Sequence, residues 1–232
     1  MTGLEITPGA WLMVVGLGTL LGLDAISWPQ TMASRPMVAG TIGGMLFGDP
    51  AAGFLAGAWL EVVSSRHPPF GAARYPETGP SALIAGAAFA LSETGSTLAL
   101  LGVVLAGWTI GWVGSYSIAL LRIYNGQLMG DPAAFGGDPA EVARRHRRAI
   151  RIDGARAALV TGALFVPVVL SVRWLETWPA GDRGAVLSPL LAVIAVAALA
   201  GVGARLLGGR REGWPPFVLG GAAGLLLLWV AA

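Results

Sequence analysis

The stretch that decides the fold is residues 97–121, TLALLGVVLAGWTIGWVGSYSIALL, which contains no charged side chain. As an α-helix rising 1.5 Å per residue, it would be about 37 Å long. The hydrocarbon core of a bilayer is roughly 30 Å thick. The stretch therefore predicts a helix that spans a membrane with some tilt.

The composition extends this prediction to the whole chain. The 232 residues are 55% hydrophobic and 12% charged, whereas soluble domains carry about 25% charged residues. A helical pass needs about 20 apolar residues, so the chain has room for roughly six to nine passes. We therefore expect an all-α, polytopic helical membrane protein that forms one integral membrane domain over residues 1–232, embedded in the lipid bilayer.

On either side of residues 97–121 the pattern predicts further elements. A helix is expected at 8–23, and spanning helices are expected within 157–232, at 157–172, 185–204 and 214–232, with Pro167 as a kink. The intervening stretch 122–156 holds seven arginines: Arg122, Arg144, Arg145, Arg147, Arg148, Arg151 and Arg156. The positive-inside rule predicts a basic cytoplasmic loop there. It is interpreted first as a topology determinant with a solvated helix face, and second as a docking surface or a contact for anionic lipid.

The N-terminal part, residues 1–96, is of a different kind. Its apolar runs at 36–48, 51–63 and 81–91 are short and are separated by Gly/Pro-rich stretches. Runs of this length are too short to span a bilayer and predict broken or re-entrant half-helices. Such backbone is tolerated in a membrane where protein buries it or water reaches it, and it is the sequence sign of a transporter's binding site.

Glu61 lies at the end of a stripe of small residues in this part. The i, i+4 spacing gives one stripe of Gly40, Gly44 and Gly48, and another of Gly53, Gly57 and Glu61. Close packing in a chain with 35 glycines explains the glycines as well as a binding role does, but it does not explain the carboxylate. An ionised side chain at mid-bilayer costs about 2.5 to 3.5 kcal/mol, so Glu61 is expected to face the protein interior or a wet cavity.

Further polar side chains gather in the same part of the chain, near Trp28, Trp59 and Tyr75. The candidate substrate-binding residues are Glu61, Asp24, Gln30, Arg35, Arg74 and Glu77. Carboxylates, amides and arginines beside aromatic faces suit a polyhydroxylated ligand. The alternative is internal ion pairing, for example of Arg35 with Asp24 or of Arg74 with Glu77. We favour that structural role for Arg35, Asp49 and Arg74, and ligand contact for Glu61.

Several chemistries are excluded by composition. The chain has no cysteine and no lysine, which rules out disulfides, thiolate metal sites, a phosphate-binding Walker lysine and a Schiff base. His67 and His146 lack metal-ligand spacing, so no metal and no cofactor are expected. The arginines concentrate in one stretch between membrane segments, so nucleic acid is not an expected partner.

Residues 23–88 carry a resemblance to a known family. The order LD…SRPMVAGTIGGMLFGDPAAGFLAGAWLEVV…FGAARYPETGPSALIA resembles the membrane IIC subunit of the mannose/fructose/sorbose class of bacterial phosphotransferase systems. The shared features are Leu-Asp at 23–24, Arg-Pro at 35–36, Gly-Asp at 48–49, GxxxE at 57–61, and GAA at 71–73 followed by Pro76 and Glu77.

The resemblance implies a sugar-conducting subunit in the bacterial inner membrane, part of an oligomeric complex with a IID-type subunit, that moves a hexose by an elevator-like shift. It implies that soluble IIA and IIB proteins phosphorylate the sugar, so no catalytic residues are expected in this chain. The longer stretch from Asp24 to Arg35 and the shorter C-terminal part leave the sugar open. Two alternatives stay open: a stand-alone ion-coupled permease in which Glu61 and Asp24 titrate, and a non-transporting regulatory scaffold whose basic loop docks soluble proteins.

Overall fold

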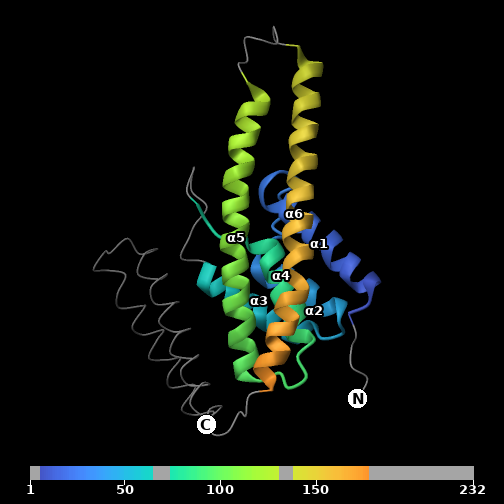
Figure 1. Ribbon diagram of the computed structural model, residues 1–232, viewed down its shortest axis with the longest axis vertical. Coiled ribbons are helices and arrows are strands. Elements are labelled where there is room, and N and C mark those ends of the chain that lie inside the picture. The colour runs from blue at the N-terminus through green and yellow to red at the C-terminus, as the bar shows by residue number, and fades with distance from the viewer. Residues whose placement is uncertain (1–5, 65–73, 131–137, 178–232) are drawn as a thin grey trace, which may run out of the picture. The chain divides into compact units, whose positions relative to one another are not determined.

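The computed structural model describes residues 6–64, 74–130 and 138–177, which all lie in the first of two units of the chain, Met1–Gly181. These residues form helices and no strand (Figure 1), which confirms the all-α class. The helices are α1 (Pro8–Ile26), α2 (Pro36–Leu46), α3 (Pro50–Ser64), α4 (Thr78–Ala90), α5 (Thr97–Met129) and α6 (Pro139–Glu176). The helices predicted at 185–204 and 214–232 lie outside the described residues.

The helices fall into two length classes. The helices α1, α5 and α6 have 19, 33 and 38 residues and are long and apolar enough to cross a membrane. The helices α2, α3 and α4 have 11, 15 and 13 residues, which gives lengths of about 16 to 23 Å and is too short to span the hydrocarbon core. The prediction of short half-helices in the N-terminal part is confirmed.

Turn residues place the boundary between α2 and α3. Gly48 has a φ of +83°, a conformation that favours glycine, and it follows the last turn of α2. The Asp49 side chain accepts a hydrogen bond of 2.8 Å from the Ala52 N–H, and Pro50 begins α3. The Gly-Asp-Pro sequence therefore ends one short helix and starts the next.

Glycines allow α2, α3 and α4 to pack at backbone distance. A Cβ added to Gly40 would lie 2.6 Å from the Gly53 carbonyl oxygen, and one added to Gly44 would lie 2.7 Å from the Gly53 Cα. On another face of α2, a Cβ added to Gly43 would lie 2.8 Å from the Ala87 nitrogen of α4. The predicted packing stripes are therefore confirmed in α2 and α3, except that Gly48 serves the turn.

Helix α4 is the centre of this arrangement. Its residues from Gly79 to Phe89 are all buried, and it packs against α2 and α3 as well as against α1, α5 and α6. The residues just before α4, Pro76 and Glu77, are buried as well, whereas Glu93 and Thr94 after its other end are exposed.

The stretch 122–156 differs from its prediction as a loop. Helix α5 continues to Met129 and α6 starts at Pro139, capped by the Asp138 side chain. Arginine is a good helix former, so charge does not end a helix. Buried residues of α5 end at Leu121 and those of α6 begin at Asp153. The distal parts of both helices therefore extend beyond the short helices as a hairpin (Figure 1).

Candidate functional site

Asp24 organises the linker between α1 and α2, residues 27–35. Its side chain is 4% exposed. One oxygen accepts hydrogen bonds from the Thr31 N–H at 2.6 Å and the Thr31 hydroxyl at 2.7 Å, and the other accepts from the Ser34 N–H at 2.9 Å. The Ser34 carbonyl in turn accepts a bond of 3.2 Å from the Thr78 hydroxyl of α4. Asp24 therefore fixes the linker against the helix core, with no ion pair to Arg35.

The linker holds two non-glycine residues in the left-handed conformation. Gln30 has a φ of 62° and Met32 a φ of 68°. Such a residue costs roughly 1 to 3 kcal/mol and persists where surrounding bonds determine it, here the three that Asp24 accepts. The side chains of Trp28, Gln30 and Met32 are exposed, and the Gln30 amide reaches back to the Ile26 carbonyl at 3.2 Å. The linker thus presents a polar amide between two large apolar side chains.

Glu61 of α3 binds the start of α2. The Arg35 Nε donates to one Glu61 oxygen at 2.9 Å, and the Arg35 Nη2 contacts the same oxygen. The other oxygen accepts from the Met37 N–H at 3.2 Å. A carboxylate at a helix N-terminus satisfies an N–H without an intrahelical partner and complements the helix dipole. The side chains of Glu61 and Arg35 are 17% and 58% exposed, so this ion pair is partly accessible.

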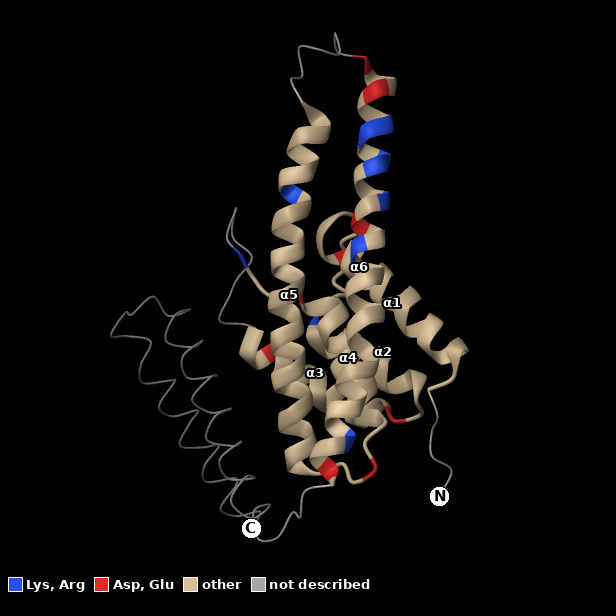
Figure 2. Cartoon of the chain, in the orientation of Figure 1, with Lys and Arg blue, Asp and Glu red and all other residues tan. Residues whose placement is uncertain are grey.

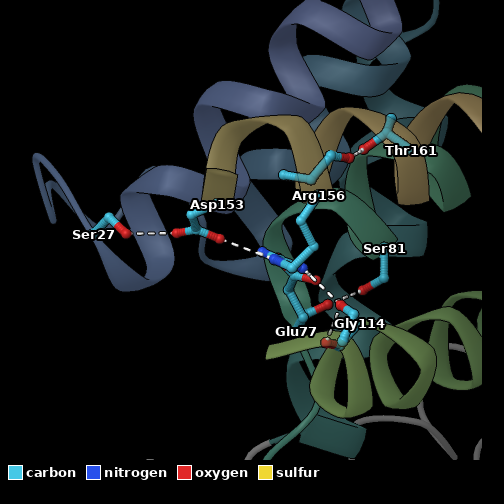
Figure 3. Close-up of polar contacts among 9 residues, drawn as sticks. Ser27, Glu77, Ser81, Gly114, Asp153, Arg156 and Thr161 are labelled. Carbon is cyan, nitrogen blue, oxygen red and sulfur yellow. Dashed lines mark hydrogen bonds and ion pairs between the residues drawn. The ribbon is translucent and has the colours of Figure 1, made fainter. Parts of the chain in front are cut away.

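A second cluster, the Arg156 network, lies where α4, α5, α6 and the linker meet (Figure 3). Arg156 donates to the two Glu77 oxygens at 2.7 and 2.8 Å, to the Ser117 hydroxyl at 2.9 Å and to Asp153 at 2.9 Å. The other Asp153 oxygen accepts from the Ser27 hydroxyl at 2.5 Å. Glu77 is 2% exposed and Asp153 is 1% exposed. The network therefore ties four segments together through buried charges.

Glycine makes room for Glu77 in this network. A Cβ added to Gly114 of α5 would lie 2.7 Å from the Glu77 Cβ, and Gly114 lies directly beside Glu77 in Figure 3. The Glu77 N–H donates to the Gly111 carbonyl at 2.8 Å. The glycines of α5 thus bring the start of α4 close enough for Glu77 to reach Arg156.

The predicted ion pairs of Arg35 and Arg74 were both wrong. Glu61 is the partner of Arg35, and Arg156 is the partner of Glu77. Arg74 is exposed and lies over the Tyr116 ring, 5.6 Å from the ring centroid, within cation–π range. Sequence proximity suggested the wrong partners because the correct ones lie 26 and 79 positions away.

Sequence reasoning missed Arg156 and Asp153 as core residues because it counted Arg156 among the arginines of a loop. One signal could have found them. Asp153 and Arg156 are three positions apart, so they share a helix face, and they directly precede the apolar run at 157–172. A charged pair at the edge of a spanning segment is a candidate for a buried network.

Hydroxyl recognition is the chemistry that the accessible groups offer. Glu61 accepts hydrogen bonds, Arg35 donates them, and Gln30 does both. Among the residues that the structure describes, no group of three or more His, Cys, Asp or Glu side chains could hold a metal ion.

Comparisons with known proteins give a family and a fold. The family model described as "PTS system sorbose-specific IIC component" matches residues 8–175, which contain nearly all of the described helices. None of the curated proteins matches the chain. A solved structure described as "Structure of membrane protein" is similar with a TM-score of 0.74 and 18% identity, over 98% of this chain and 93% of that one. At that identity the likeness concerns the fold.

Proposed function

This chain belongs to the family of sorbose-specific IIC components of the phosphotransferase system, and on that premise we propose that it binds a hexose-like sugar and carries it across the bacterial inner membrane. It is a multi-span membrane component of a sugar transporter of this system and associates with other components of it. We propose that these are a IID-type membrane subunit and the soluble IIA and IIB proteins that phosphorylate the sugar.

The observation that supports a sugar site most directly is the Glu61–Arg35 pair. A carboxylate offers about four acceptor positions, and Arg35 and Met37 supply three bonds to it. A position therefore remains for a hydroxyl donor, and the 17% exposure of Glu61 gives access to it. Arg35 has donors to spare and is more exposed still. Together they form an acceptor and a donor held side by side, the combination that adjacent sugar hydroxyls require.

The other four candidate residues take two kinds of role in this proposal. Gln30 on the linker and Arg74 beside Tyr116 are exposed and are proposed as further sugar contacts. Asp24 and Glu77 are buried, and both oxygens of each already accept hydrogen bonds from the protein. We therefore propose that these two carboxylates position the linker and the start of α4 instead of touching the sugar.

Replacing Glu61 by Gln tests the site. The chain, purified with a IID-type partner in nanodiscs, is titrated with a panel of labelled hexoses. We expect one or more hexoses to bind the native protein, and E61Q to lose at least about tenfold in affinity because hydrogen bonds to charged groups contribute about 1.5 to 3 kcal/mol.

Glu93→Gln is the matched control, since Glu93 is exposed in the connection between α4 and α5 and E93Q removes the same charge. E93Q should bind as the native protein does. Unchanged affinity in E61Q would remove Glu61 from the site, and a native complex that binds no hexose would contradict the proposed function.

A further inference from the structure

A cavity of about 470 Å³ lies between α5 and α6 at the distal end of their hairpin. In Figure 2 the ribbon of this end of α6 is coloured blue at several positions, which marks its arginines. The cavity is lined by Gln127, Leu128, Glu141, Arg144, Arg145 and Arg148. We propose that it is a binding site for a phosphate group. This proposal is independent of sugar transport, since the cavity shares no residue with the proposed sugar site.

The walls of the cavity are held in place before any ligand arrives. The four lining residues of α6 follow the i, i+3, i+4, i+7 pattern of a single helix face. Arg145 donates to the carbonyls of Leu128 and Met129 at 2.6 and 3.1 Å, where the last turn of α5 has carbonyls without intrahelical partners. Arg145 also donates to Glu141 at 2.6 Å. One arginine thus clamps the two helices together.

The remaining charges leave the cavity positive. Three arginines face one carboxylate, and Glu141 pairs with both Arg144 and Arg145. Arg148 has no ion pair with any acidic residue in the described part of the chain. Guanidinium groups match the oxygens of phosphate in planar, bidentate geometry. An oxyanion of charge −2 would balance the cavity, with Arg148 as its main partner.

The distance of the cavity from the apolar part of α6 indicates whether the phosphate belongs to a lipid headgroup or to a soluble molecule. Arg148 and Arg144 precede Arg156 by 8 and 12 residues, which places them about 12 and 18 Å along the helix from the start of the apolar run. The headgroup layer adds about 5 to 7 Å on each side of the hydrocarbon core. The spacing favours a soluble phosphate ester over a lipid headgroup.

Titration of the full chain tests the site. In nanodiscs of phosphatidylcholine, inorganic phosphate and glycerol phosphate are titrated by calorimetry at low salt. We expect saturable binding that Arg148→Gln weakens at least tenfold. Arg147→Gln removes the same charge from an exposed residue that does not line the cavity, and it should change the affinity less than twofold.

A second arm separates the two sources by repeating the titration in nanodiscs that contain phosphatidylglycerol. Persistent binding of the soluble ester supports the soluble source. The opposite result would be that phosphatidylglycerol blocks binding of the ester in the native protein and that the Arg148→Gln variant no longer retains this lipid. In that case the bound phosphate is that of a lipid headgroup, and the assignment to a soluble ester is overturned. An equal loss of phosphate affinity in Arg148→Gln and Arg147→Gln would show a diffuse effect of surface charge and would overturn the site. A native chain that binds neither the soluble phosphates nor the lipid would overturn it as well.

Discussion

At the scale of single residues, two buried carboxylates depend on one guanidinium. Glu77 and Asp153 both bind Arg156, whose own side chain is 10% exposed. Removing one member of a buried ion pair leaves an uncompensated charge and costs about 3 to 5 kcal/mol. The network is therefore a point where one substitution should affect the whole helix arrangement.

Replacing Arg156 by Met should destabilise the protein by about 3 to 5 kcal/mol, since two buried carboxylates lose their cation. Unfolding in mixed micelles, followed by circular dichroism, measures this. The control is Arg151→Met, because Arg151 is exposed and its Nε donates to the Arg147 carbonyl of the same helix. That variant should stay within about 0.5 kcal/mol of the native protein. If Arg156→Met and Arg151→Met lost similar amounts of unfolding free energy, the Arg156 network would contribute little to stability.

The sequence could predict that a polar residue such as Glu61 faces the protein interior or a wet cavity, but it could not predict which residue it pairs with. The cost of a charge in lipid singled out Glu61, and the structure places it against the start of α2. Its partner Arg35 and the Glu77–Arg156 pair are set by how α2, α3, α4 and α6 pack, which local spacing does not contain. Ion pairing and ligand contact use the same oxygens of Glu61, so the sugar affinity of E61Q distinguishes the two roles.

At the scale of elements, the short helices depend on glycine contacts. The helices α2 and α3 approach through Gly40, Gly44, Gly53 and Gly57, and their neighbours across the interface are backbone atoms. Backbone atoms cannot rotate away as a long side chain can. A single methyl group at this interface should therefore separate the helices and shift Glu61 relative to the start of α2.

Replacing Gly53 by Ala tests this. Its Cβ would lie 2.7 Å from the Gly44 Cα, and such overpacking costs about 1 to 3 kcal/mol. Gly16→Ala in α1 is the matched control, because nothing lies within 4 Å of its added Cβ, and alanine there should gain about 0.5 to 1 kcal/mol from helix propensity. Thermal unfolding of both variants provides the measurement. A stable G53A protein would contradict the close packing of α2 and α3.

The existence of the short helices could be predicted, whereas the α5–α6 hairpin could not. Apolar runs bounded by Gly, Asp and Pro mark both the burial and the ends of α2, α3 and α4. In the hairpin the helix continues after burial stops, so the apolar pattern ended at residue 121 while α5 continued to Met129. Apolar patterns mark contact with the protein core or with lipid, and an arginine-rich helix that makes neither contact leaves no such pattern.

At the scale of the whole molecule, the described helices expose large apolar side chains in quantity. Leu12 and Leu20 of α1, Leu120 of α5, and Leu159 and Leu170 of α6 are among them. Such a surface suits lipid or another membrane subunit, as the family assignment requires. The proposed function is that the chain conducts sugar within a phosphotransferase complex. Its test therefore has to include all components of that complex.

The most direct test is sugar uptake by vesicles that contain the chain and its IID-type partner, with IIA, IIB and their phosphate donor supplied. The account predicts that a labelled hexose accumulates inside as its phosphate, that accumulation requires the donor and the IID-type partner, and that an uncoupler does not abolish it. Accumulation of free sugar that needs no phosphate donor and collapses with the uncoupler would contradict the account and identify an ion-coupled permease.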